Sequence, residues 1–456
     1  MWKEMYLKEL FRRIKNPKNV YDSLLPLYMF TKIVGLCPYS YTKIVGKPKY
    51  IASFFGSTYS ISIILLFAGY YILQVEQSHS EDIVETNKIA NSIDMFQIYG
   101  GIFVMTVSVV TNIFRQKDVT NAICKIADFD QKFNYCINYK LRRNFTTCKL
   151  IRSFILFLSR NNLSHQHDLS DQNMIKVTSS GIFLVLTIFG SLEYMNCSMY
   201  LKQVGTLSTY CFLMCYVPMV INALVEYQFI TLISITKERF SLLNKELGKI
   251  GTNTINKWKN TNQIHPITKI VNHTSTNIKN IRRTHALLCN AGYEINKAYS
   301  LQILLNTAHI FINFTTLGYY CFDGAMRLYL QEEDSNMYNT VTTGIWTLCK
   351  ILQLLNITLT CSRIKKEVAL SGEVVFKIND RFKPDIAYEI NAFVKQIFHW
   401  NFKLTAFHLF DLDMELFYCA ISASTTYLMI LLQLDIANKQ SDQIEKIDGN
   451  FTNTIY

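Results

Sequence analysis

Residues 51–74 read IASFFGSTYSISIILLFAGYYILQ, a stretch of 24 residues that contains no charged side chain. As an α-helix it would be about 36 Å long, enough to cross the roughly 30 Å of hydrocarbon in a bilayer. Six further windows of similar character follow at residues 94–114, 177–195, 206–235, 299–320, 341–361 and 414–434. Because every backbone group in lipid must be paired within its own segment, each window is expected to be helical. The sequence therefore predicts an all-α, polytopic membrane protein with seven transmembrane helices.

The composition supports this class and argues against several others. Half of the 456 residues are apolar and only 18% are charged, whereas soluble domains carry about 25% charged residues. The 12 cysteines form no CxxC pair and no cluster with histidine at zinc spacing. The common nucleotide-binding, zinc-protease and serine-hydrolase motifs are absent from the sequence. We therefore expect no enzyme activity, no metal ion and no cofactor.

Lysine and arginine alternate between rich and poor loops along the chain. Segments 1–50, 115–176, 236–298 and 362–413 together hold 40 of these residues, and the loops between them with the C-terminal tail hold five. Because cytoplasmic loops carry the excess of positive charge, this pattern predicts a cytoplasmic N-terminus and an extracellular C-terminus. The net charge of +12 then reflects topology and an attraction to anionic membrane lipids, not a nucleic-acid surface.

The predicted spans divide the chain into segments with separate roles. In order these are a cytoplasmic N-terminal segment (1–50), spans one to six with their loop helices (51–361), cytoplasmic anchor helices (362–413), the seventh span (414–434) and an extracellular tail (435–456). Residues 251–280 are rich in Asn and Thr and lack a helical period, which predicts a flexible loop. Residues 385–410 alternate apolar and polar side chains at helical spacing, so the anchor is predicted to be helical throughout.

The seventh span carries a polar stripe. Ser422, Thr426, Met429 and Gln433 fall within about 60° of one another around an α-helix. A helix that faces only lipid would not align hydroxyl and amide groups in this way, so the stripe is expected to face protein or water. Two interpretations remain open, a pore lining and hydrogen bonds between packed helices.

The end of this span resembles a motif of the insect gustatory receptor family. The motif is Thr-Tyr, five mostly apolar residues and then Gln-Phe. Thr426, Tyr427 and Gln433 match it, and Leu434 stands in place of the Phe. The resemblance implies a homotetrameric cation channel that is opened by a small-molecule tastant. It also implies a location in the plasma membrane of chemosensory neurons.

Within that family the sequence is most similar to the fructose-receptor branch. Asp411 and Asp413 precede the span, and TTYL stands within it. The resemblance assigns the seventh span to a central pore. Fourfold symmetry would place Gln433 and Leu434 in rings near the outer mouth, and Asp435 just outside would attract cations.

The outer halves of the other spans offer the groups that a sugar needs, namely hydrogen-bonding side chains and an aromatic face. A lysine in mid-span costs about 2.5–3.5 kcal/mol on insertion scales, so Lys350 is expected to face a cavity or a carboxylate such as Glu193 or Glu226. The candidate ligand-binding residues, of which the four on the sixth span share one face, are Glu193, Tyr194, Thr316, Tyr319, Tyr320, Asp323, Thr343, Trp346, Lys350 and Gln353.

Other functions remain open at the level of sequence. An odorant receptor channel or a bitter-tastant receptor of the same superfamily would share this architecture. A metabotropic seven-helix receptor would place its N-terminus outside, and many transporters show internal repeats, which this sequence lacks. Cys197 and Cys321 both lie at predicted outer ends, either as a disulfide or as two free thiols.

Overall fold

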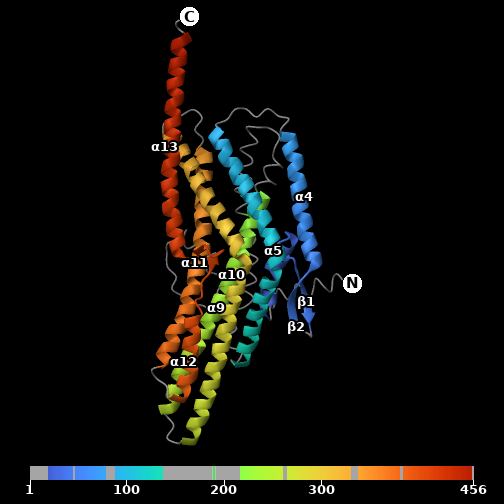
Figure 1. Ribbon diagram of the computed structural model, residues 1–456, viewed down its shortest axis with the longest axis vertical. Helices are drawn as coiled ribbons and strands as arrows, with labels where there is room; N and C mark the ends of the chain where they lie inside the picture. Colours follow the sequence, from blue (N-terminus) through green and yellow to red (C-terminus); the bar gives the residue numbers. More distant parts are fainter. Residues whose placement is uncertain are drawn as a thin grey trace.

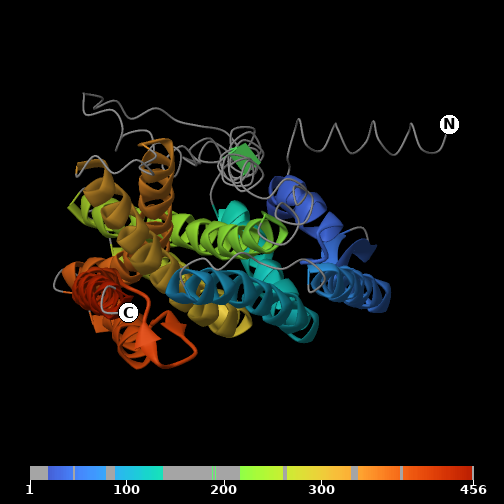
Figure 2. The ribbon, with the colours of Figure 1, turned by 90° about the horizontal axis from the view of Figure 1, so that it is seen from above.

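The computed structural model describes residues 19–44, 47–78, 88–136, 187, 190–191, 216–259, 264–329, 337–379 and 384–453. In chain order its elements are α2 (Val20–Ser23), α3 (Leu25–Ile33), β1 (Tyr39–Ile44), β2 (Lys47–Ala52), α4 (Phe54–Ser78), α5 (Lys88–Cys136), α9 (Val217–Lys259), α10 (Ile264–Tyr329), α11 (Met337–Asn379), α12 (Pro384–His399), β3 (Thr405–Ala406), β4 (Phe410–Asp411) and α13 (Met414–Asn453). The long helices run side by side, and α4 and α13 stand at opposite edges of the bundle (Figure 1 and Figure 2).

Four helices in the described part of the chain are long and apolar enough to cross a membrane. They are Gln97–Phe133, Val217–Ile250, Met337–Ile378 and Met414–Leu434, and Phe54–Tyr70 is a shorter apolar helix. These five helices overlap the second, fourth, sixth, seventh and first predicted spans. The third predicted span lies outside the described residues except for residues 187, 190 and 191. The expectation of a helical protein with membrane-spanning helices is confirmed to this extent.

The fifth predicted span lies inside α10, which is 66 residues long. The hydropathy of this part of α10 is lowered by polar side chains, among them the buried Gln302 and Asn306 and the partly buried His309. These side chains face neighbouring helices rather than lipid, as shown below. A polar interface therefore explains why α10 is not among the helices that are apolar enough to be recognised as membrane spans in the described part of the chain.

A β-hairpin before the first apolar helix corrects the all-α prediction. Strand β1 pairs antiparallel with β2, so the window 51–74 begins in a strand and α4 begins only at Phe54. The stretch 39–44 reads YSYTKI, whose aromatic and β-branched residues favour a strand. Gly56 in the first turn of α4 packs against the backbone of Pro38, where a Cβ atom would overlap the carbonyl oxygen.

A second hairpin separates α12 from α13 and corrects the prediction that the anchor is helical throughout. Helix α12 ends at His399, and β3 and β4 form a two-stranded sheet. Leu404 and Ala406 are buried, so the chain alternates its apolar residues here as a strand does. Phe407 and His408 have φ of 50° and 61°. Consecutive positive φ values are typical of a type I′ hairpin turn.

The segment 251–280, which was predicted to be a flexible loop, is largely helical. Helix α9 continues to Lys259 and α10 begins at Ile264. Thr274 and Ile278 of α10 are buried in the bundle. Tertiary packing therefore outweighs the low intrinsic helix propensity of Asn and Thr.

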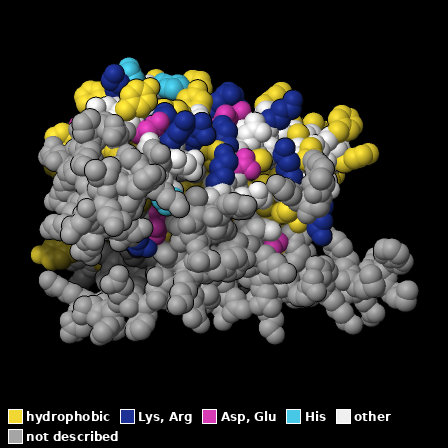
Figure 3. Space-filling model, turned by 90° about the horizontal axis from the view of Figure 1, so that it is seen from below, with side chains coloured by type: hydrophobic (Ala, Val, Ile, Leu, Met, Phe, Trp, Pro, Cys, Tyr) yellow, Lys and Arg dark blue, Asp and Glu magenta, His cyan; other side chains and the backbone are white. Residues whose placement is uncertain are grey.

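Lysine and arginine side chains gather at one end of the bundle. Figure 3 shows this end, which carries α12 and the adjoining ends of α9, α10 and α11, with many basic side chains on its described surface. Lys245 and Lys249 of α9, Arg283 of α10 and Lys377 of α11 are among the exposed ones. Basic side chains of α9, α10 and α11, which come from separate parts of the sequence, thus lie at one end of the described bundle.

Candidate functional site

The face of α11 that the sequence singled out turns into the bundle. Trp346 and Lys350 are buried, with 4% and 7% of their surfaces exposed. The Lys350 ammonium nitrogen lies 5.4 Å from the centre of the Trp346 ring, a cation–π contact. One turn further, Nε2 of Gln353 donates a hydrogen bond of 2.6 Å to Oε2 of Glu226 on α9. Three of the four residues predicted to share a face therefore lie together: Gln353 bonds to the Glu226 carboxylate, and Lys350 packs on Trp346.

Glu226 places a buried carboxyl group next to Gln353 and Lys350. Its surface is 3% exposed, and Lys350 is close enough to act on it electrostatically. Oε1 of Glu226, Oε1 of Gln353 and, one turn earlier on α9, Oδ1 of Asn222 are buried without a hydrogen-bond donor in the described part of the chain. A buried acceptor without a donor costs about 1–3 kcal/mol. These oxygens are therefore suited to a partner that donates hydrogen bonds. We call Asn222, Glu226, Trp346, Lys350 and Gln353 the acceptor cluster.

Helices α5 and α10 meet beside this cluster. Nε2 of Gln97 on α5 donates to the hydroxyl of Thr316 on α10, and Nε2 of His309 lies 3.2 Å from the Gln97 carbonyl oxygen. A Cβ atom at Gly100 would lie 3.3 Å from the His309 ring. The glycine therefore permits the close approach of the two helices, as small residues commonly do at helix interfaces in membranes. Lys350 also acts electrostatically on His309, which joins this contact to the acceptor cluster.

A polar face runs along α10 at spacings of three and four residues. Below His309, Nδ2 of Asn306 donates to the Asn222 carbonyl oxygen at 3.2 Å. Another turn below, Nε2 of Gln302 donates to the Ser108 carbonyl oxygen and to Oδ1 of Asn112, both at 3.1 Å. Together with Tyr299, Asn313 and Thr316, these residues form the polar face of α10. This face was not predicted from the sequence, although the spacing of polar residues within 299–316 carries the signal.

The remaining predicted pocket residues in the described part of the chain make contacts outside the acceptor cluster. Asp323 pairs with Arg327 one turn along α10, at 2.8 Å, and the Thr343 hydroxyl donates to a backbone carbonyl of its own helix. The rings of Tyr319 and Tyr320 lie against each other at a tilt of 57°, with their centres 5.5 Å apart. Glu193 and Tyr194 lie outside the described residues, as does Cys197. Thr316, by contrast, lies at the α5 contact described above.

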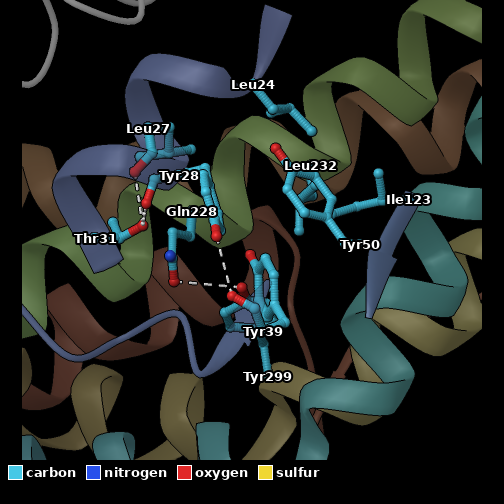
Figure 4. A pocket seen from close by; sticks show the side chains of 10 residues that line it. All are labelled: Leu24, Leu27, Tyr28, Thr31, Tyr39, Tyr50, Ile123, Gln228, Leu232 and Tyr299. Atoms are coloured by element: carbon cyan, nitrogen blue, oxygen red, sulfur yellow. Dashed lines mark hydrogen bonds between the residues drawn. The ribbon is translucent and has the colours of Figure 1, made fainter. Parts of the chain in front are cut away.

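A small cavity lies where α3 and the first hairpin pack on α5, α9 and α10 (Figure 4). Its volume is about 20 Å³, enough for one water molecule but not for a tastant. Figure 4 shows Tyr39, Tyr299 and Gln228 converging on it, with the Tyr299 hydroxyl donating to Oε1 of Gln228 at 3.4 Å. Burial raises the pKa of the neighbouring Cys37 thiol, and the protonated thiol donates to the Tyr39 hydroxyl oxygen at 3.1 Å. We interpret this cluster as structural.

Helix α13 presents its predicted stripe to the outside of the subunit. Ser422, Thr426 and Gln433 are exposed, and Met429 and Leu434 are 54% and 55% exposed. None of the apolar window Met414–Leu434 is buried within the single chain. The stripe is therefore not sealed against helices of its own subunit in the described part of the chain. The side chain of Asp435 lies outside the described residues.

The sequence of this chain is similar to those of known receptors. A family model described as 7tm Chemosensory receptor matches residues 24–438, most of the chain. The chain belongs to the 7tm chemosensory receptor family. The chemosensory receptor is also 22% identical over 444 residues to "Putative gustatory receptor 28b" of Drosophila melanogaster, covering 94% of this chain and 88% of that protein. It is 26% identical over 170 residues to "Gustatory receptor for bitter taste 66a" of the same species, which covers 36% and 32% of the two chains.

The fold of the chemosensory receptor is shared with a solved structure. The insect olfactory receptor OR5 from Machilis hrabei, in complex with eugenol, aligns with a TM-score of 0.55 and 12% identity, covering 90% of this chain and 97% of that chain. At this identity the likeness shows the fold alone. The expectation of a gustatory or chemosensory receptor is confirmed at the level of the family, which is a receptor family and not an enzyme family. The fructose branch does not follow from these relatives.

Proposed function

We propose that this receptor is a homotetrameric cation channel opened by a small hydroxyl-bearing tastant, with a sugar as the ligand class and fructose as the first candidate. The observation that carries the ligand class is the set of buried acceptor oxygens on Asn222, Glu226 and Gln353. A sugar presents several hydroxyl donors on one face and C–H groups on the other. The donors match the three oxygens, and the C–H face matches an indole such as Trp346.

The exposed stripe on α13 supports the channel part of the proposal. A row of hydroxyl and amide groups at the edge of a subunit is costly in lipid and favourable around a shared aqueous pore. Four copies around an axis would bring Gln433 and Leu434 of each copy together as a gate. Cations and membrane lipids are then the other partners, and the receptor acts in the plasma membrane of chemosensory neurons with its N-terminus in the cytoplasm.

Recording from cells that express this chain alone tests the proposal. We expect fructose, or another sugar in a panel, to evoke a cation current. Gln353→Leu and Glu226→Gln should each raise the half-maximal sugar concentration about tenfold or more, since each removes a charge-assisted hydrogen bond. Thr347→Val is the matched control on α11, because the Thr347 hydroxyl donates to the Thr343 carbonyl oxygen of its own helix. Absence of any sugar-evoked current at normal surface expression would reject the ligand class.

The gate is tested separately. Gln433→Ala should change the unliganded leak or the ligand concentration needed for opening, because it removes four amides from the narrowest ring. Thr425→Val is its control, since the Thr425 hydroxyl bonds to the Ile421 carbonyl oxygen of its own helix. A Gln433→Ala channel that is indistinguishable from wild type would contradict the assignment of the gate.

A bitter compound is the second candidate ligand. The likeness to a bitter-taste receptor over 170 residues favours it. The buried charges of Glu226 and Lys350 also suit an ionised or strongly polar organic molecule. A current evoked by bitter compounds, absent with sugars and sensitive to Glu226→Gln, would select this alternative.

A further inference from the structure

The first residues of α13 are bonded to α11. The Met414 amide donates to the Ser362 hydroxyl at 3.1 Å, and the Lys365 ammonium lies 3.1 Å from Oδ2 of Asp413. Oδ1 of Asp413 accepts from the Glu415 amide at 3.1 Å and so caps the helix. These contacts fix the beginning of α13 to the same helix that carries Trp346 and Lys350. We call Ser362, Lys365, Asp413 and Met414 the base of α13.

A second fastening lies ten residues further along α13. The hydroxyl of Thr315 on α10 donates to the hydroxyl of Ser424 at 2.9 Å, and Thr315 is 6% exposed. Close by, the rings of Phe311 and Tyr427 meet edge to face, with centres 6.1 Å apart. Beyond this point the stripe residues of α13 are exposed.

The two sides of α10 connect the acceptor cluster with α13. Thr315 bonds to α13, and the next residue, Thr316, bonds to Gln97 beside the acceptor cluster. Since both residues belong to one rigid helical turn, a movement of α10 toward or away from α5 also moves the attachment point of Ser424. The polar face of α10 supports such movement, because its hydrogen bonds can be exchanged for others with a ligand.

We propose that Thr315 and Ser424 are positioning residues that transmit movement of α10 to α13, and that α13 tilts about its base. This inference rests on the proposed channel function. Ser424 lies about 15 Å along the helix from Met414, and Gln433 lies about 28 Å from it, at 1.5 Å per residue. A sideways displacement at Ser424 is therefore roughly doubled at the Gln433 ring.

A double-mutant cycle in the full chain tests the transmission. Thr315→Val and Ser424→Ala should each shift the half-maximal ligand concentration by roughly three- to tenfold, the effect of one hydrogen bond. The double variant should shift it no further than either single variant, because the bond is already lost. Exchange of the hydroxyls, Thr315→Ser with Ser424→Thr, should restore the wild-type value. Additive shifts, or no shift, would overturn the proposal.

The matched control is Thr236→Val, a buried threonine on α9 whose hydroxyl donates to the Leu232 carbonyl of its own helix. Thr236→Val removes a threonine hydroxyl, as Thr315→Val does, but breaks no hydrogen bond between helices of the described bundle. The half-maximal ligand concentration should therefore stay at the wild-type value. Surface expression of all variants is measured in parallel. A comparable shift in Thr236→Val would show that loss of a hydroxyl, and not loss of the link, causes the effect.

A structure determination tests the tilt without any ligand. In the Thr315→Val/Ser424→Ala receptor, the displacement of α13 from its wild-type position should grow along the helix and be about twice as large at Gln433 as at Ser424. A uniform shift of the helix, or no shift, would overturn the tilt about the base. If no compound evokes a current from the wild type, the proposed function fails, and this measurement still decides the mechanical inference.

Discussion

At the scale of single residues, the absence of a side chain at Gly56 lets α4 pack closely against the backbone of Pro38. Gly56 contacts the backbone of Pro38, and a backbone atom cannot rotate away as a side chain can. We expect Gly56→Ala to lower the free energy of unfolding by about 1–3 kcal/mol, the usual cost of overpacking. A thermal melt of the purified receptor measures this change.

The same helix supplies the control. No atom lies within 4 Å of the position that a Cβ atom would occupy at Gly69. Gly69→Ala should therefore leave the melting temperature unchanged or raise it slightly, because alanine favours the helix. Equal losses in both variants would contradict a specific contact at Gly56.

A buried histidine gives the receptor a pH-dependent stability. His285 on α10 has none of its surface exposed, and its ring meets those of Phe240 and Phe393 edge to face. Burial lowers the pKa of His285 from 6.5 to about 4. Between these values the unfolded chain binds a proton that the folded chain does not, so stability is present above pH 6.5 and is lost as the pH falls toward 4.

We expect a loss of about 2 kcal/mol at pH 5 relative to pH 8 from this group. Melting temperatures measured across this range in His285→Leu should depend less steeply on pH than those of the wild type. His273→Leu removes an exposed histidine of the same helix and should leave the slope unchanged. A wild-type slope in His285→Leu would show that other groups cause the acid sensitivity.

At the scale of elements, the turn of the β3–β4 hairpin is strained, because two residues other than glycine have positive φ values. The Leu409 amide donates to the Ala406 carbonyl oxygen at 3.0 Å, which closes a turn over Phe407 and His408. Both central residues have positive φ without being glycine. A left-handed conformation costs a side-chain-bearing residue about 1–2 kcal/mol.

We therefore expect His408→Gly to raise the free energy of unfolding by about 1 kcal/mol, which a shift of the thermal melt would report. Leu409→Gly is the matched control, since Leu409 follows in the same turn without a positive φ. It should lower stability or leave it unchanged. An equal gain in both variants would mean that flexibility, and not the sign of φ, limits this turn.

At the scale of the whole molecule, the basic end of the bundle predicts its orientation in the membrane. Because exposed bases of α9, α10 and α11 share one end (Figure 3), we expect that end to lie in the cytoplasm. An epitope tag fused to the N-terminus should be detected by antibody only after the cells are permeabilised, and a tag at the C-terminus should be detected on intact cells. The reverse pattern would contradict the proposed topology.

Hydrophobic windows were enough to predict the apolar helices that the structure describes, because length and apolarity are local properties. The same approach found Lys350, since a charge in mid-span stands out. It missed the polar face of α10, because amides spaced through an apolar window lower its hydropathy without marking their partners. It also missed both hairpins, whose alternation of apolar residues is short enough to be mistaken for helical spacing. The bond between Thr315 and Ser424 joins residues 109 positions apart, and no local pattern reports such a pairing.

The position of α13 at the rim of the subunit has a genetic consequence. A single copy leaves the stripe of α13 exposed, so the proposed pore requires several copies. In the proposed fourfold channel, a cell that makes normal and damaged copies in equal amounts would build mostly rings with at least one damaged member. A lesion confined to the rim helix should therefore behave as dominant, whereas one that prevents the chain from folding should be recessive.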